Sequence, residues 1–259
     1  MEERKYALLI DADNVSPKYL SIILDEAKSY GIVSIRRIYG DWTDASKRSW
    51  KNRLVENSLI PIQQYSYTTG KNSSDSAMII DAMDILYTAS VDGFFIVSSD
   101  SDFTRLAMRL REAGKFVIGM GESKTPESFV KSVGEFKTLD VLFQNTLSAE
   151  EQEEEIVSSG NGTAVSTPQT DDAKPITSLK KIRKSVVSII EKNSDDEGKM
   201  MLSDLGRLLT NRYPDFDARN YGKYHKFSEF VRSLKECHIS MVAVSGKQKQ
   251  AYVSLSERS

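Results

Sequence analysis

The feature that most constrains the fold is an alternation of short apolar runs with helical patterns over the first half of the chain. Apolar runs typical of buried strands occur at residues 6–10, 33–39, 60–65, 93–97, 116–120 and 136–141. Helical spacing or helix-start residues occur between them, at residues 16–30, 45–56, 74–89, 103–112 and 127–133. Strands that alternate with helices form right-handed βαβ units, so we predict an α/β fold: a parallel, doubly wound sheet with helices on both faces.

A change of composition separates this region from the rest of the chain. Residues 147–177 contain a glutamate-rich run at 150–155, followed by Ser, Gly, Thr and Pro. So few apolar residues cannot form a core, and we predict an acidic flexible linker there. Helical spacing returns at residues 181–191, 201–212 and 227–236, before two strand-like runs at 239–244 and 250–255. We therefore expect an α/β domain at 1–146, a linker at 147–177 and a small winged-helix-like domain at 178–259.

The net charge of −2 conceals an uneven distribution of charge. Residues 147–178 carry 1 basic and 7 acidic residues, whereas residues 179–259 carry 16 basic and 10 acidic residues. A basic domain suits a polyanion such as nucleic acid, although many basic domains are simply well solvated.

Cysteine content and hydropathy exclude several classes of protein. Cys237 is the single cysteine, so neither an internal disulfide nor a cysteine-based zinc site can form. No apolar run reaches the roughly 18 to 20 residues that cross a bilayer, and from the N-terminal residues, which lack an apolar h-region, we expect no signal peptide. We expect a cytoplasmic protein with no membrane partner.

Acidic residues follow three of the expected strands. Asp11 and Asn14 follow the first strand, Asp100 and Asp102 follow the fourth, and Asp75 lies in the first turn of the helix after the third. The first and fourth strands of a doubly wound sheet can be neighbours at the switch point where ligands bind. Clustered carboxylates repel one another, and a hard cation such as Mg²⁺ relieves that repulsion. The pattern predicts a metal-dependent phosphoryl-transfer site.

Other interpretations of these acids stay open. Taken singly, Asp75 and Asp102 also suit the capping of the helices that follow them. Asp13 is a second-rank site candidate, because it lies two residues beyond Asp11. Asp81 and Asp84 are rotated by about 240° and about 180° from Asp75 around the same helix, so we expect them outside the site.

Three motifs in order resemble the NYN domain, the PIN-like nuclease group that includes the bacterial LabA-like proteins. They are IDADN at 10–14, Gly70-Lys71 followed by Asp75, and SSDSDF at 98–103, within a resemblance that spans about residues 5–143. The resemblance implies a PIN-like, Rossmann-like sheet and Mg²⁺- or Mn²⁺-dependent RNA cleavage, with endonucleolytic cleavage favoured. It places metal ligands at Asp11, Asp75, Asp100 and Asp102, with Asn14 as a further catalytic residue, and Lys71 as an RNA contact.

The C-terminal region resembles the OST-HTH/LOTUS domain, a winged-helix-like module associated with RNA binding. The matching segments are MLSDLG at 201–206, YPDFD at 213–217 and NYG at 220–222, within about residues 178–256. Candidate RNA-binding residues lie just before the third helix, where polar and aromatic side chains can meet phosphate or bases: Tyr221, Lys223, His225 and Lys226. Tyr221 also suits a place in the core.

Two alternative functions remain at this point. The Asp11–Ala12–Asp13 sequence superficially matches the motif of haloacid-dehalogenase-like phosphatases, but those enzymes need a flap insertion where this chain begins a helix at Ser16-Pro17. The other alternative is a catalytically weak RNA-binding scaffold, which the complete set of acids argues against. The sequence leaves the RNA substrate and the oligomeric state open, a homodimer among the options.

Overall fold

The computed structural model describes residues 3–65, 73–147, 177–222, 224–245 and 248–256. The chain divides into two compact units, residues 1–144 and 145–259. The expected linker lies almost wholly outside the described residues, as do Lys71 and Lys223.

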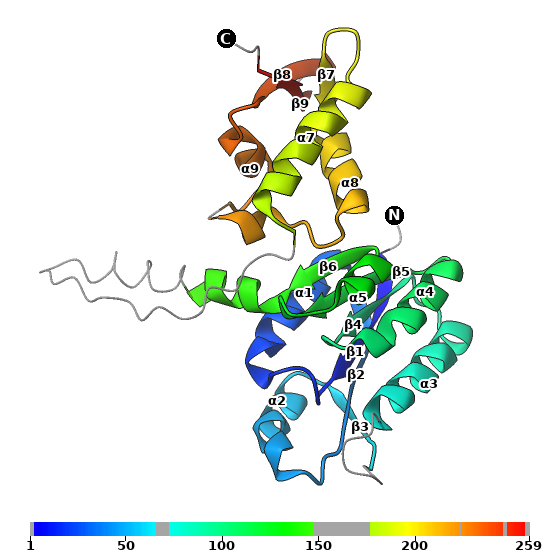
Figure 1. Ribbon diagram of the computed structural model, residues 1–259. Coiled ribbons are helices and arrows are strands. Elements are labelled where there is room, and N and C mark those ends of the chain that lie inside the picture. The colour runs from blue at the N-terminus through cyan, green and yellow to red at the C-terminus, as the bar shows by residue number, and fades with distance from the viewer. Residues whose placement is uncertain (1–2, 66–72, 148–176, 223, 246–247, 257–259) are drawn as a thin grey trace, which may run out of the picture. The chain divides into compact units, whose positions relative to one another are not determined.

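The first unit is built on a six-stranded parallel sheet with the strand order β3-β2-β1-β4-β5-β6 (Figure 1). This order is that of a Rossmann-like sheet, so the predicted fold class is confirmed. Its switch point lies between β1 and β4, which pair directly. The strands are β1 (Lys5–Asp11), β2 (Ile32–Gly40), β3 (Ile60–Gln63), β4 (Gly93–Val97), β5 (Phe116–Gly121) and β6 (Glu135–Thr138).

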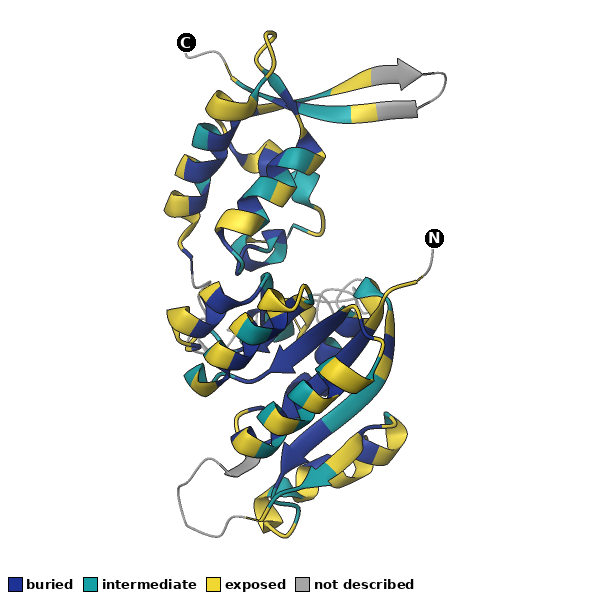
Figure 2. Ribbon diagram, turned by 90° about the vertical axis from the view of Figure 1, so that its right-hand side faces the viewer, coloured by how far each residue is buried: buried dark blue, intermediate teal, exposed yellow. Residues whose placement is uncertain are grey.

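Helices cover both faces of this sheet, and the central strands are buried along almost their whole length (Figure 2). Leu8 and Ile10 of β1 pack in one core cluster with residues of α1 and α2, while α3 contacts β1 and β2 on the opposite face (Figure 1). The α-helices are α1 (Leu20–Tyr30), α2 (Lys51–Glu56), α3 (Ser73–Thr88), α4 (Thr104–Glu112) and α5 (Glu127–Ser132). Short 3-10 turns precede three of them: η1 (Pro17–Tyr19), η2 (Ala45–Trp50) and η3 (Ser101–Phe103).

The end of this unit differs from the sequence expectation. A strand was predicted over residues 136–141, but β6 stops at Thr138 and residues 139–147 are helical. Leu139 is buried in the core cluster and Phe143 packs against it. A short apolar run does not by itself distinguish a strand from a buried helix, and packing decides here for the helix.

From residue 177 onward, the described part of the second unit forms three α-helices and a three-stranded antiparallel sheet of order β7-β9-β8. Its elements are α7 (Leu179–Asn193), β7 (Lys199–Met201), α8 (Leu202–Arg212), η4 (Ala218–Tyr221), α9 (Phe227–Ser233), β8 (Cys237–Ser245) and β9 (Gln248–Leu255). Ile182, Leu205, Leu209, Phe230 and Val253 form its buried core. The predicted winged-helix-like architecture is confirmed, with β7 as an additional strand. The predicted third helix is shorter than expected and ends at Ser233.

None of the helices that the structure describes is both long and apolar enough to cross a bilayer.

Candidate active site

The acidic residues singled out in the sequence gather at the carboxyl edge of the sheet, on both sides of the β1/β4 switch point. Asp11 is the last residue of β1, and the turn that carries Asp100 and Asp102 follows β4. Asp75 lies in the first turn of α3. Carboxylate oxygens of Asp75, Asp100 and Asp102 all lie within 4.8 Å of one another. Three of the four predicted metal ligands therefore form one cluster.

Asp11 is held in place by three hydrogen bonds. The backbone N–H of Asp13 donates to Oδ1 at 3.0 Å, and Asn14 Nδ2 and Ser98 Oγ donate to Oδ2 at 2.7 and 2.8 Å. The side chain is 1% exposed, and this burial raises the pKa of Asp11, while the three donors favour the charged form and act against the rise. Asn14 thus contacts the site by fixing the Asp11 carboxylate.

Ser98 is a residue of the site that the sequence interpretation did not single out. It is fully buried directly after β4. Its hydroxyl donates to Asp11 and accepts a hydrogen bond of 3.1 Å from the backbone N–H of Asp100, so it links the two strands at the switch point. The sequence signal that could have identified Ser98 is its position as a small polar residue between an apolar strand and an acidic turn.

Burial and neighbouring carboxylates disfavour the charged form of Asp75. Removal from water, followed by the negative charges of Asp11, Asp100 and Asp102, raises its pKa to about 7. Asp11 is therefore close enough to act on Asp75, although it is not one of the three clustered carboxylates. Oxygen donors that repel one another in this way fit a hard divalent cation such as Mg²⁺ or Mn²⁺, because the cation offsets their charge.

The turn after β4 is capped by Asp100 and not by Asp102. Asp100 accepts a hydrogen bond of 2.9 Å from the backbone N–H of Asp102, which is the N-cap arrangement for η3. The capping role considered for Asp102 is thus wrong, because the turn begins two residues earlier than expected. Asp102 lies in the first turn and is exposed.

Asp13 and Asp81 both have partners outside the cluster. Asp13 Oδ1 forms an ion pair of 2.7 Å with Lys47 Nζ. Asp81 accepts hydrogen bonds from Arg37 and Tyr39, so it ties α3 to β2. This agrees with the expectation that Asp81 lies outside the site.

The candidate RNA-binding residues of the second unit lie in different environments. Tyr221 is partly buried, its hydroxyl donates to the carbonyl oxygen of Thr177 at 2.8 Å, and its ring stacks on Phe216. This is the core position that the sequence left open for Tyr221. His225 and Lys226 are exposed, and their backbone N–H groups both donate to Glu229.

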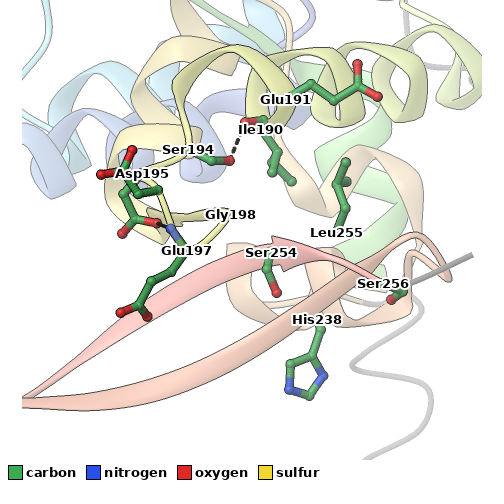
Figure 3. Close-up of a pocket in the computed structure, with 11 residues that line it drawn as sticks. Ile190, Glu191, Ser194, Asp195, Glu197, Gly198, His238, Ser254, Leu255 and Ser256 are labelled. Atoms are coloured by element: carbon green, nitrogen blue, oxygen red, sulfur yellow. Dashed lines mark hydrogen bonds between the residues drawn. The ribbon is translucent and has the colours of Figure 1, made fainter.

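A pocket in the second unit lies between the C-terminal end of α7 and the strands β8 and β9 (Figure 3). Glu191, Asp195, Asp196 and Glu197 contribute to its lining, together with His238. Four carboxylates repel a phosphate backbone, so this pocket is a poor candidate for an RNA contact.

The fold and the acidic cluster together define a PIN-like, nuclease-type domain. The chain belongs to the NYN domain family, because residues 5–140 match the model of that domain. Residues 177–244 match the OST-HTH/LOTUS domain, a type of domain that binds RNA. The family resemblance expected from the sequence is confirmed.

The individual relatives do not narrow the function further. An uncharacterized protein of Methanocaldococcus jannaschii is 25% identical over 138 residues, which are 52% of this chain and 54% of the relative, so the chain spans about half the length of that protein. A crystal structure of a Vibrio parahaemolyticus protein of unknown function shares 20% identity over 52% of this chain and 94% of the other, with a TM-score of 0.43. A periplasmic solute-binding protein of an Actinobacillus succinogenes ABC transporter, solved with bound D-allose, shares 13% identity over 74% and 66% of the two chains, with a TM-score of 0.28. Neither structural likeness is close enough to support an argument.

Proposed function

We propose that this protein is a divalent-metal-dependent ribonuclease that cleaves RNA internally, and that its C-terminal domain supplies RNA affinity. The observation that carries the proposal is the meeting of Asp75, Asp100 and Asp102 within 4.8 Å at the switch point of an NYN domain. A haloacid-dehalogenase-like phosphatase is disfavoured, because only residues 12–16 separate β1 from η1 and they leave no room for a flap.

In the proposed mechanism the acidic residues hold the metal ion and two neighbouring polar residues orient them. Asp75, Asp100 and Asp102 would hold Mg²⁺ or Mn²⁺, with Asp11 as a fourth ligand whose Oδ1 accepts one hydrogen bond and keeps a lone pair. When bound, such an ion activates water for attack on a phosphodiester and neutralises the charge that develops. Asn14 and Ser98 fix the orientation of Asp11, and Ser98 also fixes the turn that carries Asp100.

The expected activity is RNA cleavage that depends on a divalent cation. The purified protein is incubated with labelled linear and circular RNAs in Mg²⁺, Mn²⁺ or EDTA. We expect cleavage with at least one cation and none in EDTA, because the carboxylates alone repel the phosphodiester. Linearisation of the circle identifies internal cleavage. Equal cleavage in EDTA would refute the metal dependence, and an intact circle beside shortened linear RNA would refute the endonuclease assignment.

Lys226 is expected to contribute to RNA affinity without affecting chemistry. It is exposed at the N-terminal end of α9, in the more basic of the two units. In EDTA, Lys226→Ala should weaken RNA binding several-fold and reduce the slope of log affinity against log salt by about one, as expected for one lost phosphate contact. Filter binding over a range of salt concentrations measures both quantities.

The matched control is Lys192→Ala, because Lys192 is equally exposed but lies at the end of α7, beside the acidic pocket. Binding by the Lys192 variant should equal that of the wild type. If the two variants weaken binding equally, the effect reflects overall charge and the assignment of Lys226 is wrong.

A further inference from the structure

We infer that Trp42 and the basic turn after it form a subsite for single-stranded RNA beside the acidic cluster, with an unpaired base stacked on the indole and the adjoining phosphates near Lys47, Arg48 and Lys51. The inference rests on the proposed function and names the form of RNA that the site accepts.

Trp42 lies at the same sheet edge as the acidic cluster. Tyr39 of β2 is the register partner of Asp11, and the chain leaves the sheet one residue later, at Gly40. A Cβ placed on Gly40 would lie 4.0 Å from both the indole of Trp42 and the carboxylate of Asp13. The indole and the loop that follows Asp11 therefore flank the same glycine.

Trp42 is fixed through both its main chain and its ring. The backbone N–H of Trp42 donates to Gln63 Oε1 at 2.9 Å, and the indole Nε1–H donates to the carbonyl oxygen of Ile62 at 3.0 Å. Gln63 in turn donates to Asp41 at 2.9 Å. Trp42 packs against the core cluster but is only partly buried, whereas Trp50 is 1% exposed. An aromatic surface that is held rigid before binding loses little entropy when a base stacks on it.

The segment after Trp42 supplies positive charge at this edge. Residues 43–55 contain four basic residues and one acidic residue, Asp44. Lys47 Nζ donates to the carbonyl oxygen of Ala12 and pairs with Asp13, both at 2.7 Å, so it is anchored to the loop that carries Asn14. Arg48 of η2 and Lys51, the first residue of α2, follow it and are both exposed.

Aromatic and basic side chains side by side form the kind of surface that binds single-stranded nucleic acid. The positive charges attract phosphates to an edge where the carboxylates would otherwise repel them. A base in a duplex is already stacked on its neighbours and cannot also stack on the indole. The subsite thus selects unpaired RNA.

Tryptophan fluorescence provides a test that requires no cleavage. The chain contains two tryptophans, and Trp50 is buried in the core. Short single-stranded RNA added to the full-length protein in EDTA should therefore quench the emission of Trp42, and a duplex of the same sequence should not. Trp42→Phe should abolish the quenching, because only Trp50 then emits. Absence of quenching at RNA concentrations that saturate binding, measured by anisotropy of labelled RNA, would overturn the inference, as would equal quenching by the duplex.

Kinetics provide a second readout that a structural role of Trp42 would not reproduce. Stacking of one base is worth about 1–3 kcal/mol, so Trp42→Ala should raise KM for single-stranded RNA about tenfold or more and leave kcat within about twofold. Trp42→Phe should keep most of the affinity, and Tyr87→Ala, which removes an exposed aromatic ring on α3, should behave as the wild type. An unchanged KM in a folded Trp42→Ala variant would contradict the inference. Quenching without any cleavage would support the subsite and refute the proposed nuclease activity. Cleavage without quenching would support the nuclease activity and refute the subsite.

Discussion

Asp100→Asn is expected to lower the rate of RNA cleavage by at least about a hundredfold while the protein stays folded. The substitution removes one of the three clustered charges and keeps the volume of the side chain. Asparagine also caps helical turns, so the hydrogen bond from the backbone N–H of Asp102 can persist. The loss should therefore reflect cation binding and charge stabilisation at the phosphodiester. Single-turnover cleavage at saturating Mg²⁺ measures the rate, and circular dichroism with thermal melting verifies the fold.

Asp84→Asn is the matched control for this experiment. Asp84 lies on α3, as Asp75 does, but is exposed and outside the carboxylate cluster. The same change of charge at this position should leave cleavage within about twofold of the wild type. If Asp100→Asn cuts RNA at the wild-type rate, the acidic cluster is not the active site.

The placement of the acidic residues was largely predictable from the sequence. Apolar runs indicated the ends of β1 and β4; Asp11 follows the first run directly, and Asp100 follows the second after two serines. Alternation with helices implied a doubly wound sheet, in which these two strands become neighbours. Asp75 was also predictable, because it lies in the first turn of α3, the helix that follows the third strand.

Details that depend on contacts distant in sequence were not predictable. The strand β7 has only three residues and is defined by its pairing with β9, roughly fifty residues further along the chain, so local periodicity contains little signal for it. The apolar run at residues 139–147 is compatible with either a strand or a helix, and only the packing of Phe143 against the core distinguishes the two. Ser98 gains its role from a bond to Asp11 that only the sheet brings about.

The choice between functional and core roles for aromatic residues also required the structure. Tyr221 and Trp42 are both aromatic residues near candidate RNA contacts. Tyr221 stacks on Phe216 and donates its hydroxyl to Thr177, which places it in the core of the second unit. Trp42 is equally fixed but borders the acidic edge. Both side chains are partly buried and pack against the core of their unit, so the place of each ring in the fold, not its residue type or burial, separates the two.

Asp75→Asn is expected to stabilise the metal-free protein while it removes activity. The folded state raises the pKa of Asp75 from 3.8 to about 7, so near neutral pH folding forces a charge into an unfavourable site. Asparagine resembles the protonated acid and avoids this cost. The full pKa shift corresponds to about 4 kcal/mol of folding free energy. Solvent near the exposed Asp102 screens part of the repulsion. We therefore expect the variant to gain about 1–2 kcal/mol in free energy of unfolding, or roughly 3–6 °C in Tm.

The pH dependence of this difference has a defined sign. A pKa that is higher in the folded state than in the unfolded state gives stability that is complete below about pH 4 and is lost as the pH rises to about 7. The variant and the wild type should therefore have similar Tm values near pH 4, and the Tm of the variant should exceed that of the wild type by its full amount above pH 7. Tryptophan emission is a suitable probe, because both tryptophans lie in the first unit.

Divalent cations should reverse the order of stability. Mg²⁺ or Mn²⁺ binds the folded wild type and offsets the repulsion among its carboxylates, so it should raise the Tm of the wild type above pH 7. Asp75→Asn lacks one ligand and should respond much less, and Asp84→Asn should respond as the wild type does. If Asp75→Asn melts below the wild type in EDTA at pH 8, the cluster is not electrostatically strained, and relief of repulsion can no longer be the reason that these carboxylates hold a metal.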